Sequence, residues 1–358
     1  MALRHDKPLR GRGALGNSDN RYDTRALEYV DDGWGSLEAR PDRIPTELHV
    51  DRARSVIAYN DSPDVPFDRS INPYRGCEHG CIYCFARPAH AWLGWSPGLD
   101  FETRLTWKPD APEILRRELA RPGYRCAPLA LGINTDAYQP IERRLRLTRR
   151  LLEVLAGCGH PVSIVTKSAG VERDLDLLVP MAEAGRVSVA VSLTTLDAEL
   201  ARRMEPRAAA PRRRLEMIRR LSEAGIPVSV LVAPVIPVLT DGELETLLAA
   251  AREAGALDAG HVLLRLPREV APLFEDWLAV HEPRRAAHVL ARLRDCRGGA
   301  LYDSRFGARM TGTGPYADLI AQRFRLARRR LGFPGLPPLD CSGFRPPRAG
   351  DDRQLDLF

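Results

Sequence analysis

Lysine is almost absent from this chain of 358 residues. Of its 53 basic residues only Lys7, Lys108 and Lys167 are lysine, so arginine carries nearly every positive charge. Runs of arginine in such a sequence reflect its composition and do not by themselves indicate a binding site. A lysine, in contrast, is a candidate for a role that requires a compact ammonium group, which the planar guanidinium of arginine does not provide.

Long apolar runs and a strong excess of charge are also missing. No segment approaches the roughly 20 apolar residues that a membrane span requires, and the N-terminal MALRHDKPLRGRG lacks the apolar stretch of a secretory signal. We therefore expect a soluble, cytoplasmic protein with no membrane partner. The net charge of +6 is spread along the chain and is too small to establish a nucleic-acid binder by itself.

The cysteines do not form a disulfide pattern. Their number, seven, is odd, and a chain without a secretory signal is expected in a reducing compartment, where thiols stay free. Three of them lie close together, as Cys77, Cys81 and Cys84. The other four, each expected to be a small buried residue, are Cys126, Cys158, Cys296 and Cys341.

From about residue 68 onward, short apolar runs alternate with longer amphipathic runs, which is the pattern of repeated βα units. The apolar runs predict buried parallel strands at 129–134, 161–168, 187–195, 228–237 and 261–267, and RSINPYRG predicts a shorter first strand. Helices are predicted at 110–121, 142–157, 172–185, 211–225 and 241–255. Because six strands are fewer than the eight of a closed barrel, the sequence predicts an α/β fold with a partial, open parallel (β/α)6 barrel.

The barrel is expected to span residues 68–300. Residues 1–67 have little periodicity and predict a mostly irregular N-terminal arm that folds back on the body, with RGRG near its start as a solvated segment or, alternatively, a nucleic-acid contact. A helical extension is predicted at 301–332 and a flexible Pro/Gly-rich tail at 333–358. Chemistry in parallel β/α folds occurs at the carboxyl ends of the strands, so the residues after each apolar run are the candidates for a site. They are residues 77–84, 134–136, 166–168, 192–195, 234–237 and Arg265.

The three clustered cysteines have the spacing C-x3-C-x2-C in GCEHGCIYCF. One loop of this length can surround a single inorganic cluster, and Gly76 and Gly80 give the backbone the freedom to do so. Three ligands leave one metal position open. A structural zinc site would need a fourth ligand, for which His79 and His90 are candidates, and it remains an alternative.

The cysteine motif, with an aromatic residue before its third cysteine, resembles the hallmark of the radical S-adenosylmethionine (SAM) superfamily. The motifs NTDAYQPIE, VTKS with RDLDLL, VSLTTLD with MEPR, and APVIP follow in order and resemble the spore photoproduct lyase group of DNA-repair-like proteins, more closely a bacterial branch of that group than the lyase itself. The resemblance covers about residues 68–300. It implies that Cys77, Cys81 and Cys84 hold a [4Fe-4S] cluster whose free iron binds SAM. An electron from a donor such as flavodoxin or ferredoxin would then cleave SAM reductively to a 5′-deoxyadenosyl radical.

The resemblance also implies roles for side chains at the strand ends. Tyr83 would lie beside the adenine, and Ser192 and Thr194 would approach the ribose or the methionine part of SAM. Lys167 would bind a carboxylate or a substrate phosphate, unless it is a surface lysine. Asp136 would hold the SAM amino group or cap the segment that follows it.

Two departures limit what the resemblance implies. The Gly-Gly-Glu run that many superfamily members carry after the second strand is replaced by Asn134, Thr135 and Asp136, so these residues are expected to bind SAM differently. The lyase keeps a hydrogen-donating cysteine at that strand end, whereas GINTD has no thiol. Reversal of the spore thymine dimer itself is therefore not expected, and Cys126 and Tyr138 are the alternative candidate donors.

The last five residues form a separate motif. QLDLF resembles the short peptide by which bacterial replication and repair proteins bind the DNA polymerase sliding clamp, here at the end of a Pro/Gly-rich tether. Its anchors would be Gln354, Leu355, Leu357 and Phe358. The alternative is that these residues fold back on the barrel.

Together the motifs favour a radical SAM enzyme, lyase-like or of another radical reaction, that acts on nucleic acid in DNA repair, with DNA and the sliding clamp as partners. Two alternatives remain open. One is a radical SAM enzyme that modifies a peptide or a small molecule, and the other is a metal-binding module without catalysis. Glu205 and Arg207, from MEPR, either form a structural ion pair or line the substrate channel.

Overall fold

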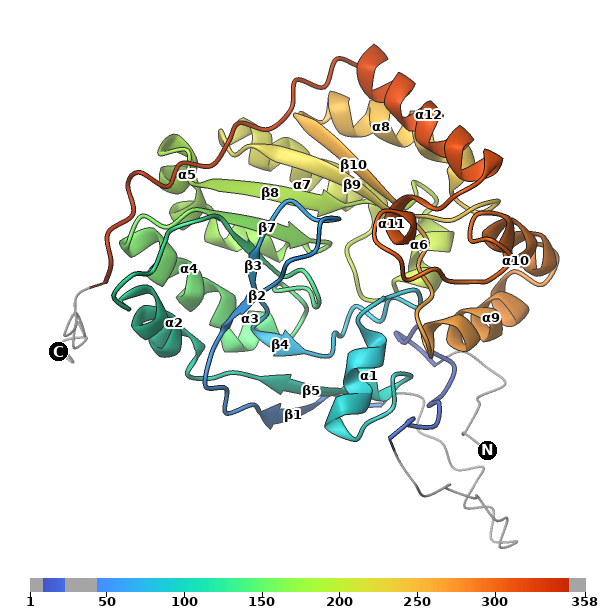
Figure 1. The fold of residues 1–358 in the computed structure, drawn as a ribbon, viewed down its shortest axis with the longest axis horizontal. Coiled ribbons are helices and arrows are strands. Elements are labelled where there is room, and N and C mark those ends of the chain that lie inside the picture. The colour runs from blue at the N-terminus through green and yellow to red at the C-terminus, as the bar shows by residue number, and fades with distance from the viewer. Residues whose placement is uncertain (1–8, 23–43, 348–358) are drawn as a thin grey trace, which may run out of the picture.

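The computed structural model describes residues 9–22 and 44–347, and a seven-stranded sheet forms its centre (Figure 1). The strand order is β10-β9-β8-β7-β6-β3-β2, with parallel neighbours from β3 to β10 and β2 antiparallel to β3. The strands are β2 (Ile57–Tyr59), β3 (Arg69–Ile71), β6 (Leu129–Leu131), β7 (Val162–Thr166), β8 (Val187–Ser192), β9 (Val228–Val235) and β10 (Asp258–Leu263). The edge strands β2 and β10 do not pair with each other, so the predicted open barrel with six parallel strands is confirmed.

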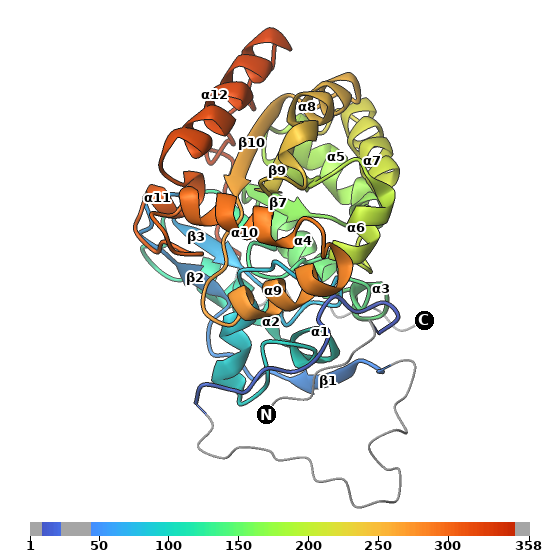
Figure 2. The ribbon, with the colours of Figure 1, turned by 90° about the vertical axis from the view of Figure 1, so that its right-hand side faces the viewer.

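Helices pack along the outside of this sheet (Figure 2). They are α2 (Ala111–Leu119), α4 (Leu147–Gly157), α5 (Leu175–Glu183), α7 (Pro211–Glu223) and α8 (Leu244–Glu253), each within a predicted helical range. Leu152, Ile218 and Leu248 of these helices are fully buried against strand residues such as Val189 and Val230. Strands covered in this way are apolar along their whole length, which is why the sequence revealed them.

Three helical ranges are less regular than predicted. The range 142–157 divides into α3 (Glu142–Leu145) and α4, because Arg146 between them has a left-handed φ of 49°. The buried carboxylate of Glu142 fixes this break by accepting the backbone N–H of Thr148. The other two ranges open with a 3-10 turn, at η2 (Ala169–Asp174) and η3 (Asp241–Glu243).

The last barrel strand begins earlier than predicted. The predicted range was 261–267, but β10 starts at Asp258 and ends at Leu263. Residues 258–260 pair with Ser229–Leu231 of β9, although Asp258, Ala259 and Gly260 have little apolar side-chain surface. Hydrogen bonding to a neighbouring strand, rather than side-chain apolarity, therefore defines where this strand begins.

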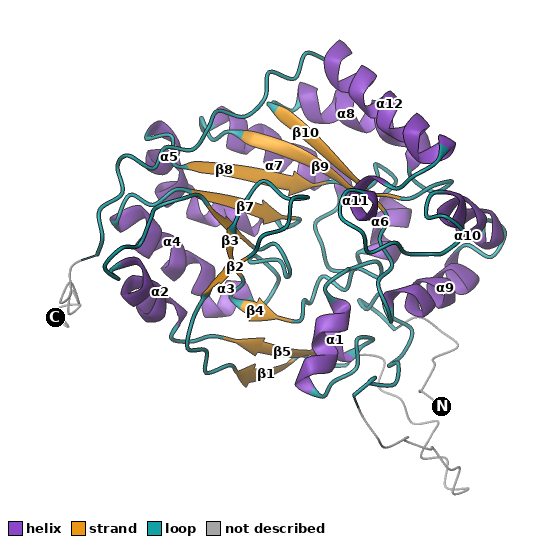
Figure 3. Cartoon of the chain, in the orientation of Figure 1, coloured by secondary structure: helices purple, strands orange, loops and turns teal. Residues whose placement is uncertain are grey.

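Several elements around the carboxyl end of the barrel were not predicted (Figure 3). They are β1 (Glu47–Val50), β5 (Arg104–Trp107), η1 (Arg87–Leu93), α1 (Asp100–Thr103), α6 (Ala198–Met204), α9 (Val270–His281) and α10 (Ala286–Asp295). The predicted first strand RSINPYRG divides into β3 and β4 (Tyr74–Arg75), and β4 joins β5 and β1 in a separate three-stranded sheet. Phe274 and Trp277 of α9 belong to the same buried cluster as Ile82 and Tyr83. These elements therefore support the segment that carries the clustered cysteines.

The segments outside the predicted barrel pack on its body. The N-terminal arm supplies β1 and β2, and the C-terminal extension supplies α11 (Ala308–Thr311) and α12 (Pro315–Arg330). Ile320 and Phe324 of α12 lie in the main apolar core, where the helix contacts α8 and β10. No helix within the described ranges is both long and apolar enough to cross a membrane.

Residues 333–347 run back across the loops that precede the barrel strands, as the red segment of Figure 1 shows. Backbone N–H groups of this segment donate to carbonyl oxygens of Leu257, Gly185 and Cys158, which come shortly before β10, β8 and β7. The segment is extended, as predicted for a Pro/Gly-rich stretch, but these hydrogen bonds attach it to the barrel.

His160 lies beneath this C-terminal segment. Its ring is buried, 5.2 Å from the ring of Phe344, with Nδ1 2.9 Å from the carbonyl oxygen of Pro161 and Nε2 2.8 Å from the hydroxyl of Tyr124. A carbonyl oxygen only accepts, so Nδ1 carries the proton and Nε2 accepts from Tyr124. Burial lowers the pKa of His160 from 6.5 to about 4, which keeps the ring neutral in the folded protein.

Mild acid is therefore expected to destabilise the protein through His160. The unfolded chain binds a proton below pH 6.5 and the folded protein only near pH 4, so stability falls as the pH drops below 6.5. At pH 5 the free energy of unfolding should be lower than at neutral pH by about 2 kcal/mol. Urea unfolding near neutral pH and at pH 5 measures it. The wild type should lose more stability than His160→Gln, and equal losses would contradict the assignment.

Candidate active site at the cysteine loop

The three clustered cysteines lie in the loop that follows β3 and β4, at the carboxyl end of the barrel strands. The loop turns back on itself, because the carbonyl oxygen of Cys77 accepts from the N–H of Gly80 and that of Cys81 accepts from the N–H of Cys84. Gly80 has a φ of 67°, a conformation that favours glycine. Cys77 and Cys81 are buried and Cys84 is half-buried, so this loop holds the thiols away from bulk water.

A buried carboxylate, Glu102, fixes the N-terminal arm against this loop. It accepts hydrogen bonds of 2.9 Å from the N–H groups of both Gly13 and Ala14, and one of 2.6 Å from Arg87. Arg87 is fully buried and also donates to the carbonyl oxygen of Gly80. The arm is therefore part of the scaffold of the loop, and the expectation that RGRG forms a solvated segment is wrong.

Gly13→Ala is expected to displace the arm from the loop. A Cβ at Gly13 would collide with the carbonyl oxygen of Gly80, which belongs to the backbone between two cysteines. Overpacking of this kind typically costs about 1–3 kcal/mol, which urea unfolding would measure. Gly157→Ala is the matched control, because a Cβ there meets nothing within 4 Å. Equal stability of the two variants would show that the arm does not pack as described.

The chemistry of the three thiols fits an iron–sulfur cluster. Burial raises the pKa of Cys77, Cys81 and Cys84, and for Cys77 the charges of Asp136 and of the other two cysteines raise it further. Thiolates in this loop therefore need a bound metal to stabilise them. Three soft sulfur ligands on one buried loop match the ligand set of such a cluster, with one iron left free of cysteine.

The two histidines considered as a fourth zinc ligand have other neighbours. His79 Nδ1 lies 3.3 Å from Asp136 Oδ2, and the ring of His90 lies 5.2 Å from that of Trp95 and 5.5 Å from that of Phe101. Within residues 9–22 and 44–347, no three His, Cys, Asp or Glu side chains are grouped to hold one metal ion. The cysteines of a cubane cluster each bind a different iron, so they need not converge on one point. The arrangement favours the cluster.

A polar network lies beside the cysteines. The hydroxyl of Tyr83 donates to Glu205 and lies 3.1 Å from Thr194 Oγ1. Lys167 Nζ donates to Ser192 Oγ over 2.5 Å and lies 3.5 Å from Glu205 Oε1. Three predicted SAM-binding residues, Tyr83, Thr194 and Lys167, thus contact one carboxylate, and a fourth, Ser192, joins them through Lys167.

Lys167, at the end of β7, and Asp136, in the loop after β6, bring opposite charges to this part of the site. Lys167 is largely buried, which rules out a surface lysine, and burial lowers its pKa to about 8 while Cys81 opposes the shift. Asp136 accepts the backbone N–H of Lys167 over 2.7 Å. Burial raises the pKa of Asp136, but His79 and several hydrogen bonds lower it below its usual value. An ammonium and a carboxylate in one site can bind the two charged groups of an amino acid.

Asn134 and Thr135 do not join this network. Thr135 Oγ1 donates to the carbonyl oxygen of Tyr74 over 2.8 Å, and the N–H of Asn134 donates to Asn72 Oδ1 over 2.9 Å. Both residues therefore tie the loop after β6 to the segment that leads into the cysteines. Their contact with a cofactor stays a prediction.

Comparison with known families decides the class of protein. Residues 71–251, about half of the chain, match the family model described as Radical SAM superfamily. This chain belongs to the radical SAM superfamily. The prediction made from the cysteine motif is confirmed, and membership implies a [4Fe-4S] cluster and SAM as cofactors.

The relatives of this radical SAM protein include bacterial and archaeal chains. An uncharacterized protein of Mycobacterium tuberculosis is 43% identical over 221 residues, which cover 61% of this chain and 65% of that protein. One of Methanocaldococcus jannaschii is 28% identical over 173 residues, which cover 48% of this chain and 62% of that protein. The chain thus spans a little under two thirds of the length of these relatives.

Solved structures of spore photoproduct lyase share the fold. A mutant of that lyase has a TM-score of 0.54 at 17% identity, covering 83% of this chain and 86% of the lyase chain. The lyase complexed with dinucleoside spore photoproduct has a TM-score of 0.51 at 16% identity, covering 79% and 78%. The similarity to this group within the radical SAM superfamily, predicted from the strand-end motifs, is confirmed at the level of the fold.

The motifs shared with the superfamily did not reveal the ion pair at the centre of the network. Arg214 of α7 is buried and pairs with Glu205. The sequence offered Arg207 as the partner, but Arg207 Nη1 lies 2.8 Å from Glu78 Oε1 instead. Arg214 was missed because it is one of three consecutive arginines at the start of α7. Its position one heptad before the buried Leu221 was the available signal that it faces inward.

The two candidate hydrogen donors lie in different parts of this radical SAM fold. Cys126 lies in the segment before β6, at the amino ends of the strands and so opposite the cysteine loop, and that candidate is wrong. Tyr138 is buried, and its hydroxyl donates to Asp174 over 3.0 Å. Its proton therefore takes part in a structural hydrogen bond.

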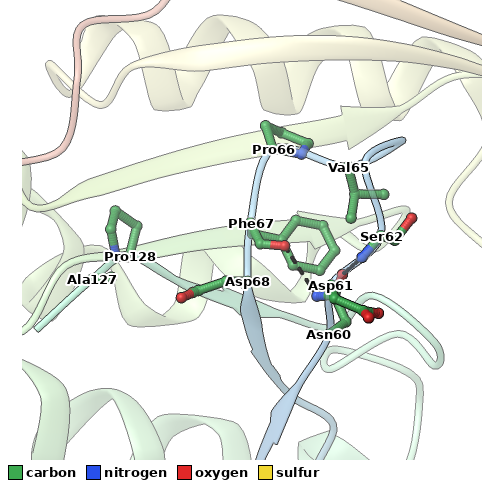
Figure 4. Close-up of a pocket in the computed structure, with 9 residues that line it drawn as sticks. All are labelled: Asn60, Asp61, Ser62, Val65, Pro66, Phe67, Asp68, Ala127 and Pro128. Atoms are coloured by element: carbon green, nitrogen blue, oxygen red, sulfur yellow. Dashed lines mark hydrogen bonds between the residues drawn. The ribbon is translucent and has the colours of Figure 1, made fainter. Parts of the chain in front are cut away.

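A surface pocket lies away from the radical SAM site (Figure 4). It is lined by Asn60, Asp61, Ser62, Val65, Pro66, Phe67, Asp68, Ala127 and Pro128. These residues precede β3 and β6, so the pocket lies at the amino ends of those strands. It is not part of the cysteine site.

Proposed function

We propose that this radical SAM enzyme acts on nucleic acid, in lyase-like or other repair-like radical chemistry. The substrate class is supported by the fold shared with spore photoproduct lyase, solved in complex with dinucleoside spore photoproduct, and by the strand-end motifs that resemble its group. The observation that carries the chemistry is the meeting of Lys167, Glu205 and Tyr83 beside the three cysteines.

In the proposed reaction Cys77, Cys81 and Cys84 hold the cluster. When bound, the cluster supplies one electron that cleaves SAM into methionine and a 5′-deoxyadenosyl radical. Lys167 binds the carboxylate of SAM, because its ammonium is already desolvated and lies at the end of β7. Asp136 accepts from the amino group of SAM, and its lowered pKa keeps it charged for that purpose.

The remaining predicted SAM-binding residues are positioned by their hydrogen bonds. Tyr83 and Thr194 both bond to Glu205, which holds the tyrosine ring in place for the adenine. Ser192 is held between Lys167 and the carbonyl oxygen of Ala233. Burial of this set excludes water, which protects a radical from side reactions.

The test is SAM cleavage with and without DNA. Anaerobically reconstituted protein that receives dithionite, or reduced flavodoxin or ferredoxin, together with SAM should form 5′-deoxyadenosine, and damaged DNA should increase the amount. Equal amounts with damaged DNA, intact DNA and no DNA would contradict a nucleic-acid substrate and point to a peptide or a small molecule. Cluster-loaded protein that forms none would contradict SAM cleavage itself.

We also propose that the C-terminal QLDLF binds the sliding clamp. Gln354, Leu355, Leu357 and Phe358 lie outside the described residues, so the proposal depends on the motif alone. The attached segment 333–347 ends shortly before it, so a short tether would separate the motif from the barrel. Deleting residues 354–358 should abolish binding to purified clamp, and unchanged binding would overturn this proposal.

A further inference from the structure

Two exposed aromatic rings lie on the surface, and one of them is next to the cysteine loop. Phe85 directly follows the third cysteine and is 39% exposed, and Phe306, just before α11, is 60% exposed. Neither ring is needed to fill the core, in contrast to the buried aromatic residues of α9. Exposed aromatic faces close to a reactive centre are typical of sites that stack against planar ligands.

Arginines lie over both rings and connect them. The guanidinium carbon of Arg265 is 5.0 Å from the ring centroid of Phe85, and that of Arg309 is 4.5 Å from the centroid of Phe306. Arg265 Nη1 lies 3.3 Å from the sulfur of Met310, the residue after Arg309 in α11. The aromatic and cationic side chains therefore form one strip from the cysteine loop to α11, whose helix also contacts β10.

The two arginines differ in their partners. Arg309 pairs with Asp64 and donates to Ser62, so the β2–β3 loop holds it in place. Arg265 acts on the charge of Asp64 but makes no ion pair with any residue that the structure describes, and its Nε is buried without a hydrogen-bond partner. A buried guanidinium N–H without an acceptor is costly, and a phosphate oxygen would satisfy it. Arg265 lies two positions after Leu263, the last residue of β10, and therefore at the carboxyl end of the barrel.

We propose that this strip, Phe85, Arg265 and Phe306, binds unpaired nucleotides next to the cysteine loop. The proposal rests on the proposed nucleic-acid function and names the surface that would carry it. The two rings stack on bases, and Arg265 binds the phosphate between them. Stacked base pairs hide their faces, so a strip of this kind selects single-stranded or extruded nucleotides over intact duplex.

The test compares variants of the strip with a surface control. The probe is fluorescently labelled single-stranded DNA of about 12 nucleotides, bound to the reconstituted full chain and followed by anisotropy. Phe306→Ala should weaken binding about tenfold, because stacking contributes that much per base. Leu326→Ala is the control, since Leu326 is 54% exposed on α12, and it should bind like the wild type.

Arg265 gives an independent readout. Arg265→Gln should reduce the slope of log affinity against log salt by about 0.7, the share of one phosphate on a single strand, and Arg265→Lys should restore it. Wild type and variants should all bind duplex DNA of the same sequence more weakly than the single strand. The variants should also differ less from the wild type on duplex than on the single strand. Iron content and thermal unfolding of each variant show that the fold is intact.

The outcomes separate the two proposals. If the wild type binds no DNA, the nucleic-acid function itself is contradicted. If the wild type binds but Phe306→Ala and Arg265→Gln behave like Leu326→Ala, the strip is overturned while the function stands. A labelled peptide that binds as tightly as the DNA and competes with it would assign the strip to a protein partner instead.

Discussion

Replacing Cys81 by alanine is expected to abolish formation of 5′-deoxyadenosine. Cys81 lies in the middle of the loop, buried and close to Lys167 and Glu205, whose charges both act on its thiol. Without it the loop supplies two sulfur ligands, too few to retain the cubane. Iron and sulfide analysis after anaerobic reconstitution, together with the SAM-cleavage assay, measures the effect.

The matched control is Cys341→Ala. Cys341 is a half-buried free thiol on the C-terminal segment, which lies at the amino ends of the strands. This variant should retain iron and SAM cleavage at the wild-type level. Iron content that falls equally in both variants would contradict the assignment of the cysteine loop as the cluster site.

Glu205→Gln is expected to have the largest effect on stability. Glu205 and Arg214 are both almost fully buried, and removing one partner leaves the other charge buried without compensation. Such a loss typically costs about 3–5 kcal/mol. The same change removes the acceptor of Tyr83 and the charge beside Lys167, so the KM for SAM should rise as well. Urea unfolding and SAM titration measure the two effects.

Glu216→Gln is the control for that prediction. Glu216 pairs with Arg220 along the exposed face of α7, the helix that also carries Arg214, and such exposed pairs are worth less than about 1 kcal/mol. Adding Arg214→Met to Glu205→Gln should restore part of the lost stability, because the uncompensated charge is then gone. A Glu205→Gln protein as stable as Glu216→Gln would show that the buried pair is not formed.

The sequence predicted the barrel because its strands are covered on both faces. A strand such as Val187–Ser192 is buried at every position, so its apolar run is continuous and easy to recognise. The start of β10 was missed because Asp258 and Gly260 are strand residues only through pairing with β9. The same holds for the N-terminal arm, whose docking depends on a backbone contact at Gly13 that leaves no periodic signal.

The cysteine ligands were predictable and the polar network was only partly so. Spacing within one loop is local, and therefore Cys77, Cys81 and Cys84 could be identified from eight consecutive positions. Glu205 and Arg214 are brought together by the approach of α6 and α7 to the strand ends, which no local pattern specifies. In a sequence this rich in arginine, residue type alone could not single out Arg214.

The central claim is that three thiols bind one iron–sulfur cube and leave an iron free for SAM. Electron paramagnetic resonance of the anaerobically reconstituted, dithionite-reduced protein tests it most directly. We predict the signal of a reduced [4Fe-4S] cluster, with iron and sulfide in equal amounts, and a change of that signal when SAM is added. A protein that binds zinc in place of iron, or a cluster signal that SAM leaves unchanged, would contradict the claim.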